Sequence, residues 1–285
     1  MSTAARLALA LVAVVVASVV GPATAAPVAP PQGYVALGDS YTAGPGIPFP
    51  DPHPPGCHRS DHNYPHLVAQ PAGAARFRDV SCSGAGTAHM TAPQAVRGGS
   101  NPPQLDALDA ATTLVTLGIG GNDIGFGEIV SSCFTALPVG TPCQSIYTSG
   151  GRDEISRRIA ETAPRVGGVL TAIQERSPEA RVLVVGYPAI LPDSGLGCWP
   201  VLPVAPGDVP YLREKTKELN AMLAREAAAH ADTFVDVYGP SIGHDACALP
   251  GHRWVEPAVP ASPAAPVHPN AAGMGGMARA VLAAL

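Results

Sequence analysis

The sequence predicts an α/β fold in which helices cover a parallel sheet. Short apolar runs alternate along the chain with longer segments of helical character, which is the pattern of strands and crossover helices in such folds. The later apolar runs are rich in Val, Leu and Ile and do not alternate with polar residues, as expected for parallel strands buried on both faces. The length is sufficient for one large domain with a full core.

Five strands are expected, and they follow one another at intervals that leave room for a helix or a long loop. Each is a short run of apolar and β-branched residues bounded by polar or turn-forming residues. In chain order they cover residues 34–37, 77–80, 113–118, 181–187 and 233–237.

Three longer segments between and after these strands predict helices. Residues 152–175 form one helix despite Pro164, residues 210–231 form another, and residues 271–285 form the last. Asn270 is a favourable N-cap for the last helix, because its side-chain oxygen can accept a hydrogen bond from a free backbone N–H of the first turn. His268 is therefore expected on the loop that enters this helix.

The first segment of the chain predicts export. Arg6 is followed by the apolar residues 7–20, a Gly-Pro pair and a run of small residues, which is the order of a Sec-type signal peptide. A run of 14 residues, apolar except for Ser18, is shorter than the stretch of about 20 that a transmembrane helix needs. We expect residues 1–26 to be a signal peptide, and residues 27–285 to form a single secreted, extracellular domain.

Charge and cysteine content agree with a secreted enzyme. The chain has 22 acidic against 17 basic residues and no cluster of Lys or Arg, which argues against a nucleic-acid partner. Six cysteines behind an export signal predict three disulfides, for which the sequence alone permits 15 pairings. A thiol nucleophile or a metal ligand at Cys82 is the competing interpretation, and an oxidising compartment disfavours it.

Ser40 is the expected nucleophile. It lies in the segment 38–44, with the sequence GDSYTAG, directly after the first expected strand. A hydroxyl at the carboxyl end of a strand stands where open α/β sheets bind ligands, and flanking glycines let a substrate approach the backbone closely. Asp39 is expected to bond the local backbone and not to act as a triad acid, because adjacent strand residues point to opposite faces.

Three distant segments supply what an acyl-transfer serine needs. His268, in the segment Val-His-Pro-Asn, is the candidate base, because imidazole has a suitable pKa. The oxyanion needs donors fixed in advance. The backbone N–H groups of Ser40 and Gly84 and the side-chain amide of Asn122 fit that role, Gly84 lying in SCSGAG and Asn122 in GGND. An ordinary turn residue is the alternative for Asn122.

These four segments together resemble the GDSL esterases and lipases, also called the SGNH hydrolase superfamily, from Tyr34 to the C-terminus. The resemblance implies a three-layer α/β/α, flavodoxin-like fold with a five-stranded parallel sheet. It also implies that Ser40 is nucleophile and first oxyanion donor, that Gly84 and Asn122 are the other donors, and that His268 is the general base. The cysteine layout, the segment 57–60 (CHRS) and the His-Pro-Asn ending resemble the secreted bacterial lipases and phospholipase-like esterases.

The secreted branch also implies two finer features. Its members suggest pairing of the cysteines nearest in order, namely Cys57 with Cys82, Cys133 with Cys143 and Cys198 with Cys247. Many relatives carry Asp three residues before the histidine, but here that residue is Ala265. The resemblance therefore implies a Ser-His dyad, in which the main-chain carbonyl of Ala265 or Pro266 accepts the Nδ1–H of His268. Such a carbonyl fixes the tautomer but stabilises imidazolium less than a carboxylate does.

A rival nucleophile is Ser241. Residues 239–243 match the Gly-x-Ser-x-Gly elbow of α/β-hydrolases, and Asp245 and His268 follow in that fold's order. An elbow needs a helix directly after the serine, whereas residues 244–251 read as a loop held by a disulfide, and too little chain remains for the further strands. The context therefore favours Ser40.

Two other sets of residues, four histidines near Cys57 and the pair Arg59 and Tyr64, can each be interpreted as functional or as ordinary structural residues. His53, His58, His62 and His66 cluster near Cys57, but the many prolines and the absence of Cys-x-x-Cys spacing favour solvated loop residues over zinc ligands. Arg59 and Tyr64 are expected at the same rim as Ser40. They are candidates for binding a polar head group, and a surface arginine and a packing tyrosine are the alternatives.

The expected function is hydrolysis of carboxyl esters through an acyl-enzyme on Ser40, without metal or cofactor. The branch that the chain resembles favours a lipid or small-molecule ester as substrate and transient contact with a lipid surface, and we expect a monomer. Two alternatives are a polysaccharide O-acetyl esterase with the same machinery and a secreted binding module that has lost catalysis.

Overall fold

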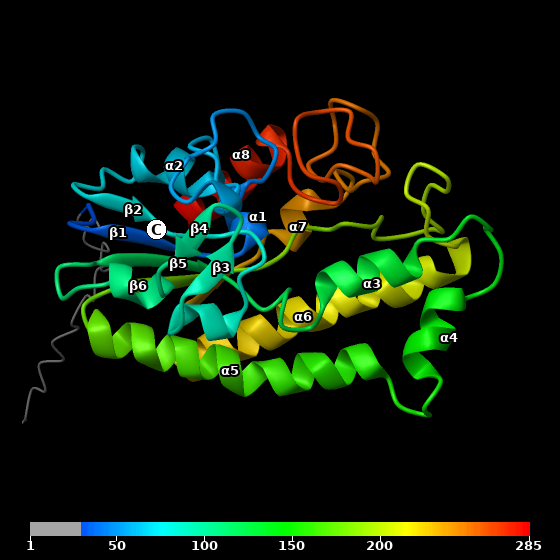
Figure 1. Ribbon diagram of the computed structural model, residues 1–285, viewed down its shortest axis with the longest axis horizontal. Coiled ribbons are helices and arrows are strands. Elements are labelled where there is room, and N and C mark those ends of the chain that lie inside the picture. Colours follow the sequence, from blue (N-terminus) through cyan, green and yellow to red (C-terminus); the bar gives the residue numbers. More distant parts are fainter. Residues whose placement is uncertain (1–29) are drawn as a thin grey trace, which may run out of the picture.

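The computed structural model describes residues 30–285 (Figure 1). The expected signal peptide, residues 1–26, lies outside the described residues. Within the described part, no helix is both long enough and apolar enough to cross a membrane.

A five-stranded parallel sheet forms the centre of the molecule, as predicted. Its strands are β1 (Tyr34–Gly38), β2 (Phe77–Asp79), β5 (Leu114–Gly118), β6 (Arg181–Val185) and β7 (Thr233–Val235). They lie in the order β2-β1-β5-β6-β7, and all neighbours are parallel. The chain thus adds β2 on one side of β1 and the later strands on the other, so the order reverses between β1 and β5. Loops at such a reversal diverge and leave a crevice at the carboxyl ends of the strands.

The register brings two of the expected site segments to this crevice. Gly38 pairs with Gly118, so β1 and β5 end side by side. Ser40 follows the first strand by two residues, and Asn122 follows the second by four. Both segments therefore emerge at the same edge of the sheet.

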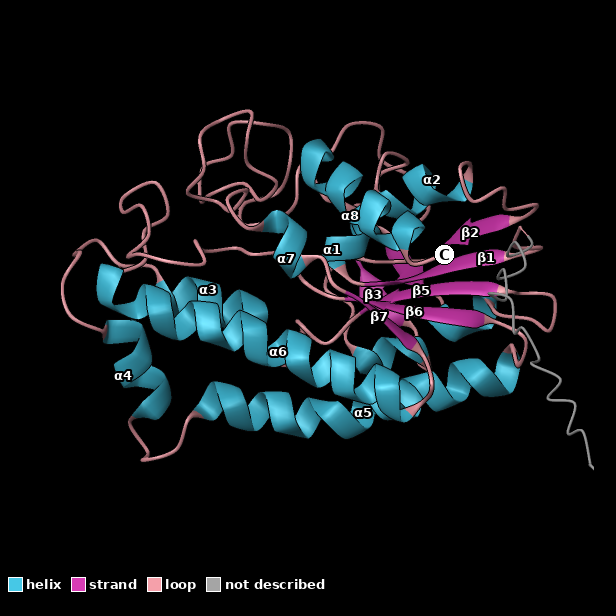
Figure 2. Cartoon of the chain, turned by 180° about the vertical axis from the view of Figure 1, so that it is seen from behind, coloured by secondary structure: helices cyan, strands magenta, loops and turns pink. Residues whose placement is uncertain are grey.

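Helices cover both faces of the sheet, which gives three layers (Figure 2). The two long helices α5 (Glu154–Arg176) and α6 (Val209–Ala229) pack against each other and cover one face. Helices α2 (Tyr64–Ala69) and α8 (Ala271–Ala283) cover the other face. The Asn270 side chain accepts a hydrogen bond from the N–H of Gly273 at 3.0 Å, so α8 begins where the sequence predicts.

Three predicted strands, β2, β6 and β7, end earlier than expected, and β6 shows one reason. The last bond of β6 to its neighbour is that of the Gly186 N–H to the Val235 carbonyl of β7, at 3.1 Å. At Tyr187 the Asn220 side chain of α6 bonds both backbone groups instead, each at 2.8 Å. A Cβ at Gly186 would lie 2.8 Å from the oxygen of Asn220. A side-chain amide thus replaces the sheet ladder at this point.

Several short elements were not predicted. They comprise the hairpin of β3 (Gln94–Val96) and β4 (Gly99–Asn101), the helices α1 (Ser40–Ala43), α3 (Phe126–Cys133), α4 (Pro142–Thr148) and α7 (Tyr238–Ser241), and 3₁₀ turns at Pro55–Cys57, Thr87–Met90, Gln104–Ala107 and Pro206–Asp208. Most of these elements lie in the connections that surround the carboxyl ends of the strands.

The structure contains three disulfides, Cys57–Cys82, Cys133–Cys143 and Cys198–Cys247. They are the pairs that the family resemblance implies. Each ties a loop to a nearby segment, and none crosses the sheet.

Candidate active site

Ser40 is the first residue of α1, which turns sharply from the end of β1. Asp39 caps this helix, since its side chain accepts the N–H of Tyr41 at 2.8 Å. The helix folds back on the strand so closely that a Cβ at Gly38 would lie 2.2 Å from the hydroxyl oxygen of Thr42. Only glycine fits there, and the turn presents the Ser40 side chain at the edge of the sheet.

The structure brings Ser40 and His268 together. The Ser40 Oγ lies 2.8 Å from Nε2 of His268, although 228 residues separate them in the sequence. The histidine comes from the loop before α8, as expected. The pair lines a pocket together with Gly84 and Asn122, and Ser40 is 8% exposed at its floor.

The second nitrogen of His268 faces a backbone carbonyl. Nδ1 lies 2.7 Å from the oxygen of Pro266, so the Nδ1–H donates to it and Nε2 is free to accept from Ser40. Of the two carbonyls expected from the sequence, that of Ala265 instead accepts the backbone N–H of His268 at 3.2 Å. Within residues 30–285, no Asp or Glu bonds this imidazole.

Burial lowers the pKa of His268 below its usual value, because the surroundings of the ring exclude water and disfavour the cation. The hydrogen bond to the Pro266 carbonyl opposes this effect. The imidazole is therefore neutral at pH 7, and it can accept a proton from the serine.

The histidine loop contains a strained residue that sequence reasoning missed. Val267 has a positive φ of 59°, which is unusual for a β-branched side chain. Its carbonyl accepts a hydrogen bond from the hydroxyl of Tyr41 at 2.7 Å, and its N–H donates to the backbone carbonyl of Glu256 at 3.1 Å. The Tyr41 ring also lies 5.1 Å from the His268 ring. Tyr41, the residue after Ser40, thus holds the turn that presents His268.

The expected oxyanion donors lie around the same pocket. Gly84 has a φ of 80°, in the left-handed region that glycine tolerates best. One N–H of the Asn122 side chain donates to the Ala85 carbonyl at 2.8 Å, which fixes the amide and leaves its second N–H available. These groups and the N–H of Ser40 can meet a negatively charged oxygen near the serine.

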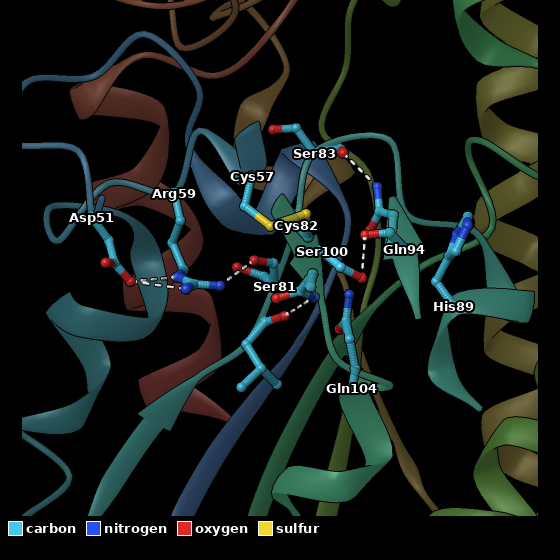
Figure 3. The surroundings of a disulfide bond; sticks show 12 residues. Asp51, Cys57, Arg59, Ser81, Cys82, Ser83, His89, Gln94, Ser100 and Gln104 are labelled. Carbon is cyan, nitrogen blue, oxygen red and sulfur yellow. Dashed lines mark hydrogen bonds and ion pairs between the residues drawn. A yellow bond between two sulfur atoms is a disulfide. The ribbon is translucent and has the colours of Figure 1, made fainter. Parts of the chain in front are cut away.

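The turn that carries Gly84 is held by the first disulfide and its polar neighbours (Figure 3). Arg59 donates to the Ser81 carbonyl at 2.6 Å and pairs with Asp51 at 2.8 Å. On the other side, the Gln94 amide donates to the Ser83 carbonyl at 2.8 Å. Three independent constraints therefore fix the backbone just before Gly84.

This arrangement contradicts the head-group interpretation of Arg59 and Tyr64. Arg59 is 5% exposed, and its guanidinium is used by backbone and carboxylate partners. Tyr64 is fully buried against the sheet. Both side chains are structural.

Asp39 links the nucleophile to the Asn122 segment, a connection that was also missed. The Tyr187 hydroxyl donates to its carboxylate at 2.6 Å and accepts the N–H of Gly121 at 2.8 Å. Burial raises the pKa of Asp39 to about 7. Through Tyr187, the residue before the nucleophile and the residue before Asn122 share one buried hydrogen-bond chain.

The rival nucleophile Ser241 is fully buried. Its hydroxyl donates to the Tyr238 carbonyl and accepts the N–H of Ala189, each at 2.8 Å, so it is unavailable for attack. Asp245 bonds the N–H of Cys247 and not His268. Among the described residues, the histidines near Cys57 belong to no group of three or more His, Cys, Asp or Glu side chains that could hold a metal ion.

An apolar cavity of about 80 Å³ lies next to the serine pocket. Phe126, Val130 and Val267 line both spaces. The far walls come from helices α5 and α6, with Ile155, Leu212 and Leu219 among the lining residues. This cavity can therefore accommodate an apolar group attached to a carbonyl carbon at Ser40.

Comparisons with known proteins agree with this geometry. The family profile described as GDSL-like Lipase/Acylhydrolase matches residues 36–275. "Lipase 2" of Streptomyces coelicolor is 43% identical over 250 residues, which cover 86% of this chain and 82% of that protein. A lipase of Streptomyces rimosus is 32% identical over 78% of this chain and 75% of its own length.

Two solved structures share the fold. Phospholipase A1 from Streptomyces albidoflavus superposes with a TM-score of 0.75 at 28% identity, covering 89% of this chain and 99% of that one. The extracellular lipase of Streptomyces rimosus gives a TM-score of 0.74 at 29% identity, covering 89% and 100%. From the profile, the curated relatives and the shared fold, we conclude that the chain belongs to the GDSL-like lipase/acylhydrolase family and is a carboxylic ester hydrolase.

Proposed function

We propose that this protein is a secreted lipase or esterase that works through an acyl-enzyme on Ser40. The observation that carries the proposal is the 2.8 Å contact between Ser40 Oγ and His268 Nε2, in a pocket that also contains Gly84 and Asn122.

The reaction follows from these positions in two halves. Ser40 Oγ attacks the ester carbonyl carbon while its proton passes to Nε2, and the oxyanion accepts hydrogen bonds from the N–H groups of Ser40 and Gly84 and from Asn122. The intermediate collapses as the leaving alcohol takes the proton from Nε2, which leaves the acyl group on Ser40. Water then attacks the acyl carbon and gives one proton to Nε2. The second intermediate collapses, Ser40 Oγ takes that proton back from Nε2, and the carboxylic acid leaves.

The Pro266 carbonyl takes the orienting role that a carboxylate has in a triad. It holds the proton on Nδ1, so Nε2 faces the serine as an acceptor. Because the pKa of His268 is lowered, the acid limb of kcat/KM is expected below the usual range for histidine.

The apolar cavity favours esters of longer acyl chains over acetyl groups. An acyl chain that extends past Phe126 and Val130 is lined mostly by apolar side chains. The names of the relatives, lipases and a phospholipase A1, support the same substrate class. Export is supported by the predicted signal peptide and by the extracellular relative from Streptomyces rimosus.

A direct test compares the purified protein with Ser40→Ala on a soluble short-chain chromogenic ester. We expect steady turnover by the first and a loss of about 10⁴-fold or more in kcat for the second. An inert parent protein, or a variant that keeps its activity, contradicts the proposal.

A further inference from the structure

A second surface feature lies at the end of the molecule that carries the apolar cavity. Two loops, residues 134–141 and 194–205, lie against each other there, and we call them the two-loop surface. The N–H of Thr135 donates to the Pro203 carbonyl at 2.7 Å, and the indole N–H of Trp199 donates to the Thr135 carbonyl at 3.2 Å. Figure 1 places both loops beyond the ends of α3 and α6.

This surface concentrates the exposed apolar side chains of the described chain. Five of the eleven large ones lie on it, which is far more than its share of the residues. They are Leu137, Val139, Leu196, Trp199 and Val201. Exposed apolar residues gathered in this way mark sites of contact with membranes or other proteins.

Disulfides hold both loops in place. Cys133–Cys143 closes the base of the first loop, and Cys198–Cys247 ties the second to a neighbouring segment. The apolar side chains therefore cannot easily withdraw into the core, and they stay exposed while the protein is in solution.

The charge pattern indicates what covers the surface. Residues 129–151 and 194–207 contain no Lys, Arg, His, Asp or Glu. The neighbouring Arg213 is largely buried, and its guanidinium donates to the carbonyls of Pro192 and Gly195. The two segments themselves thus offer a charged partner no complementary side chain, whereas a zwitterionic lipid–water interface needs none. Trp199, with its bonded N–H and partly exposed ring, is of the type enriched at such interfaces.

The same loops also reach the cavity. Phe134, Leu202 and Val204 line it from beneath the surface, and the cavity in turn shares its walls with the Ser40 pocket. We propose that the two-loop surface docks on a zwitterionic phospholipid surface, from which an acyl chain reaches the cavity. The docking itself does not depend on hydrolysis, and only its purpose rests on the proposed function.

The test uses the Ser40→Ala protein, so that hydrolysis cannot consume the vesicles. We expect it to co-sediment with phosphatidylcholine vesicles. Its tryptophan emission is expected to shift to shorter wavelength, since the other tryptophan, Trp254, is already buried. Adding anionic phosphatidylserine should not strengthen binding, because the two loops themselves carry no cationic side chain.

Substitutions locate the contact. Val139→Asp with Leu196→Asp should lower the bound-to-free ratio by about tenfold or more, because two apolar anchors become charged. The matched control, Val259→Asp with Leu67→Asp, changes the same residue types away from the two loops and should bind as before. With Ser40 intact, both double variants should hydrolyse a soluble short-chain ester at the unchanged rate.

Three results would overturn the inference. The first is no vesicle binding by Ser40→Ala, and the second is equal binding by the two double variants. The third is self-association in sedimentation velocity that Val139→Asp with Leu196→Asp abolishes, which would make the surface an interface between copies. Loss of soluble-ester turnover in the parent protein would instead count against the proposed function alone.

Discussion

At the scale of single residues, the candidate site combines two features. A backbone carbonyl and not a carboxylate orients His268, and a strained residue, Val267, lies in the turn that presents it. The Pro266 carbonyl is neutral, so it orients His268 without strongly raising its pKa. Tyr41, next to Ser40, bonds the histidine loop at Val267, and Tyr187 joins Asp39 to the Asn122 loop.

The first prediction concerns the identity of the base. His268→Ala should lower kcat by about 10⁴-fold or more, since it removes the imidazole nitrogen that lies 2.8 Å from Ser40 Oγ. Asp245→Ala should leave the kcat of the folded protein nearly unchanged, because the Asp245 side chain accepts the backbone N–H of Cys247 and does not bond the imidazole. Steady-state rates on a soluble ester measure both, and equal losses would restore an aspartate triad.

Tyr41→Phe tests the strained turn. The variant keeps the ring against His268 but loses the hydrogen bond to Val267, so kcat should fall by about tenfold with KM little changed. The control is Tyr34→Phe on β1, which removes a buried hydroxyl that lies 3.0 Å from the hydroxyl of Thr116 on β5. If both variants lose stability but neither loses kcat, Tyr41 has no positioning role.

Asp39 gives the stability a pH dependence. Its folded pKa of about 7 lies above the usual 3.8, so folding favours the protonated form. The contribution is fully present below pH 3.8 and is lost as pH rises through about 7, a change of up to about 4 kcal/mol. Asp39→Asn should therefore flatten the free energy of unfolding between these limits in denaturant titrations. An unchanged slope would show that Asp39 titrates near its normal pKa.

At the scale of elements, the sequence analysis located the sheet strands and the last helix correctly. The strands are continuous apolar runs, and α8 begins at a residue whose capping preference is strong. The C-terminal end of β6 and the hairpin of β3 and β4 were missed, because a side chain from α6 and contacts across the fold decide them. The same applies within the site. Motifs revealed Ser40 and His268, but no local pattern could reveal that Tyr41 holds Val267 or that Pro266, and not Ala265, accepts the Nδ1–H.

The first disulfide is an element whose role extends to catalysis. Cys57→Ala with Cys82→Ala should lower the free energy of unfolding by about 2–5 kcal/mol, and it should also lower kcat, because the turn before Gly84 loses a constraint. Cys198→Ala with Cys247→Ala should destabilise the protein by a similar amount and keep kcat on a soluble ester. Thermal melts and initial rates separate the two effects. Equal kcat values for both pairs would mean that Arg59 and Gln94 hold the turn by themselves.

The cavity between α3, α5 and α6 predicts chain-length selectivity. Leu212→Trp fills it from the α6 side, so kcat/KM for long-chain esters should fall by about tenfold or more while short-chain esters react as before. Rates on a series of chromogenic esters of rising acyl length measure this change. A uniform loss across the series would place the acyl chain elsewhere.

At the scale of the whole molecule, the site is a product of the sheet topology. Ser40 and Asn122 meet because the strand order reverses between β1 and β5, and His268 reaches them because α8 covers the adjacent face. The segments are far apart in the sequence, so composition alone could not join them. The order of four short motifs was sufficient to predict that these segments meet, because the family resemblance supplied the topology.

The central claim is that Ser40 is the reactive alcohol of a Ser-His pair. Labelling with an active-site phosphonate ester, followed by peptide mapping, tests it most directly. The account predicts a single adduct on the peptide that contains Ser40, and none in the His268→Ala protein. An adduct on Ser241, or labelling of Ser40 that is unaffected by His268→Ala, would contradict it.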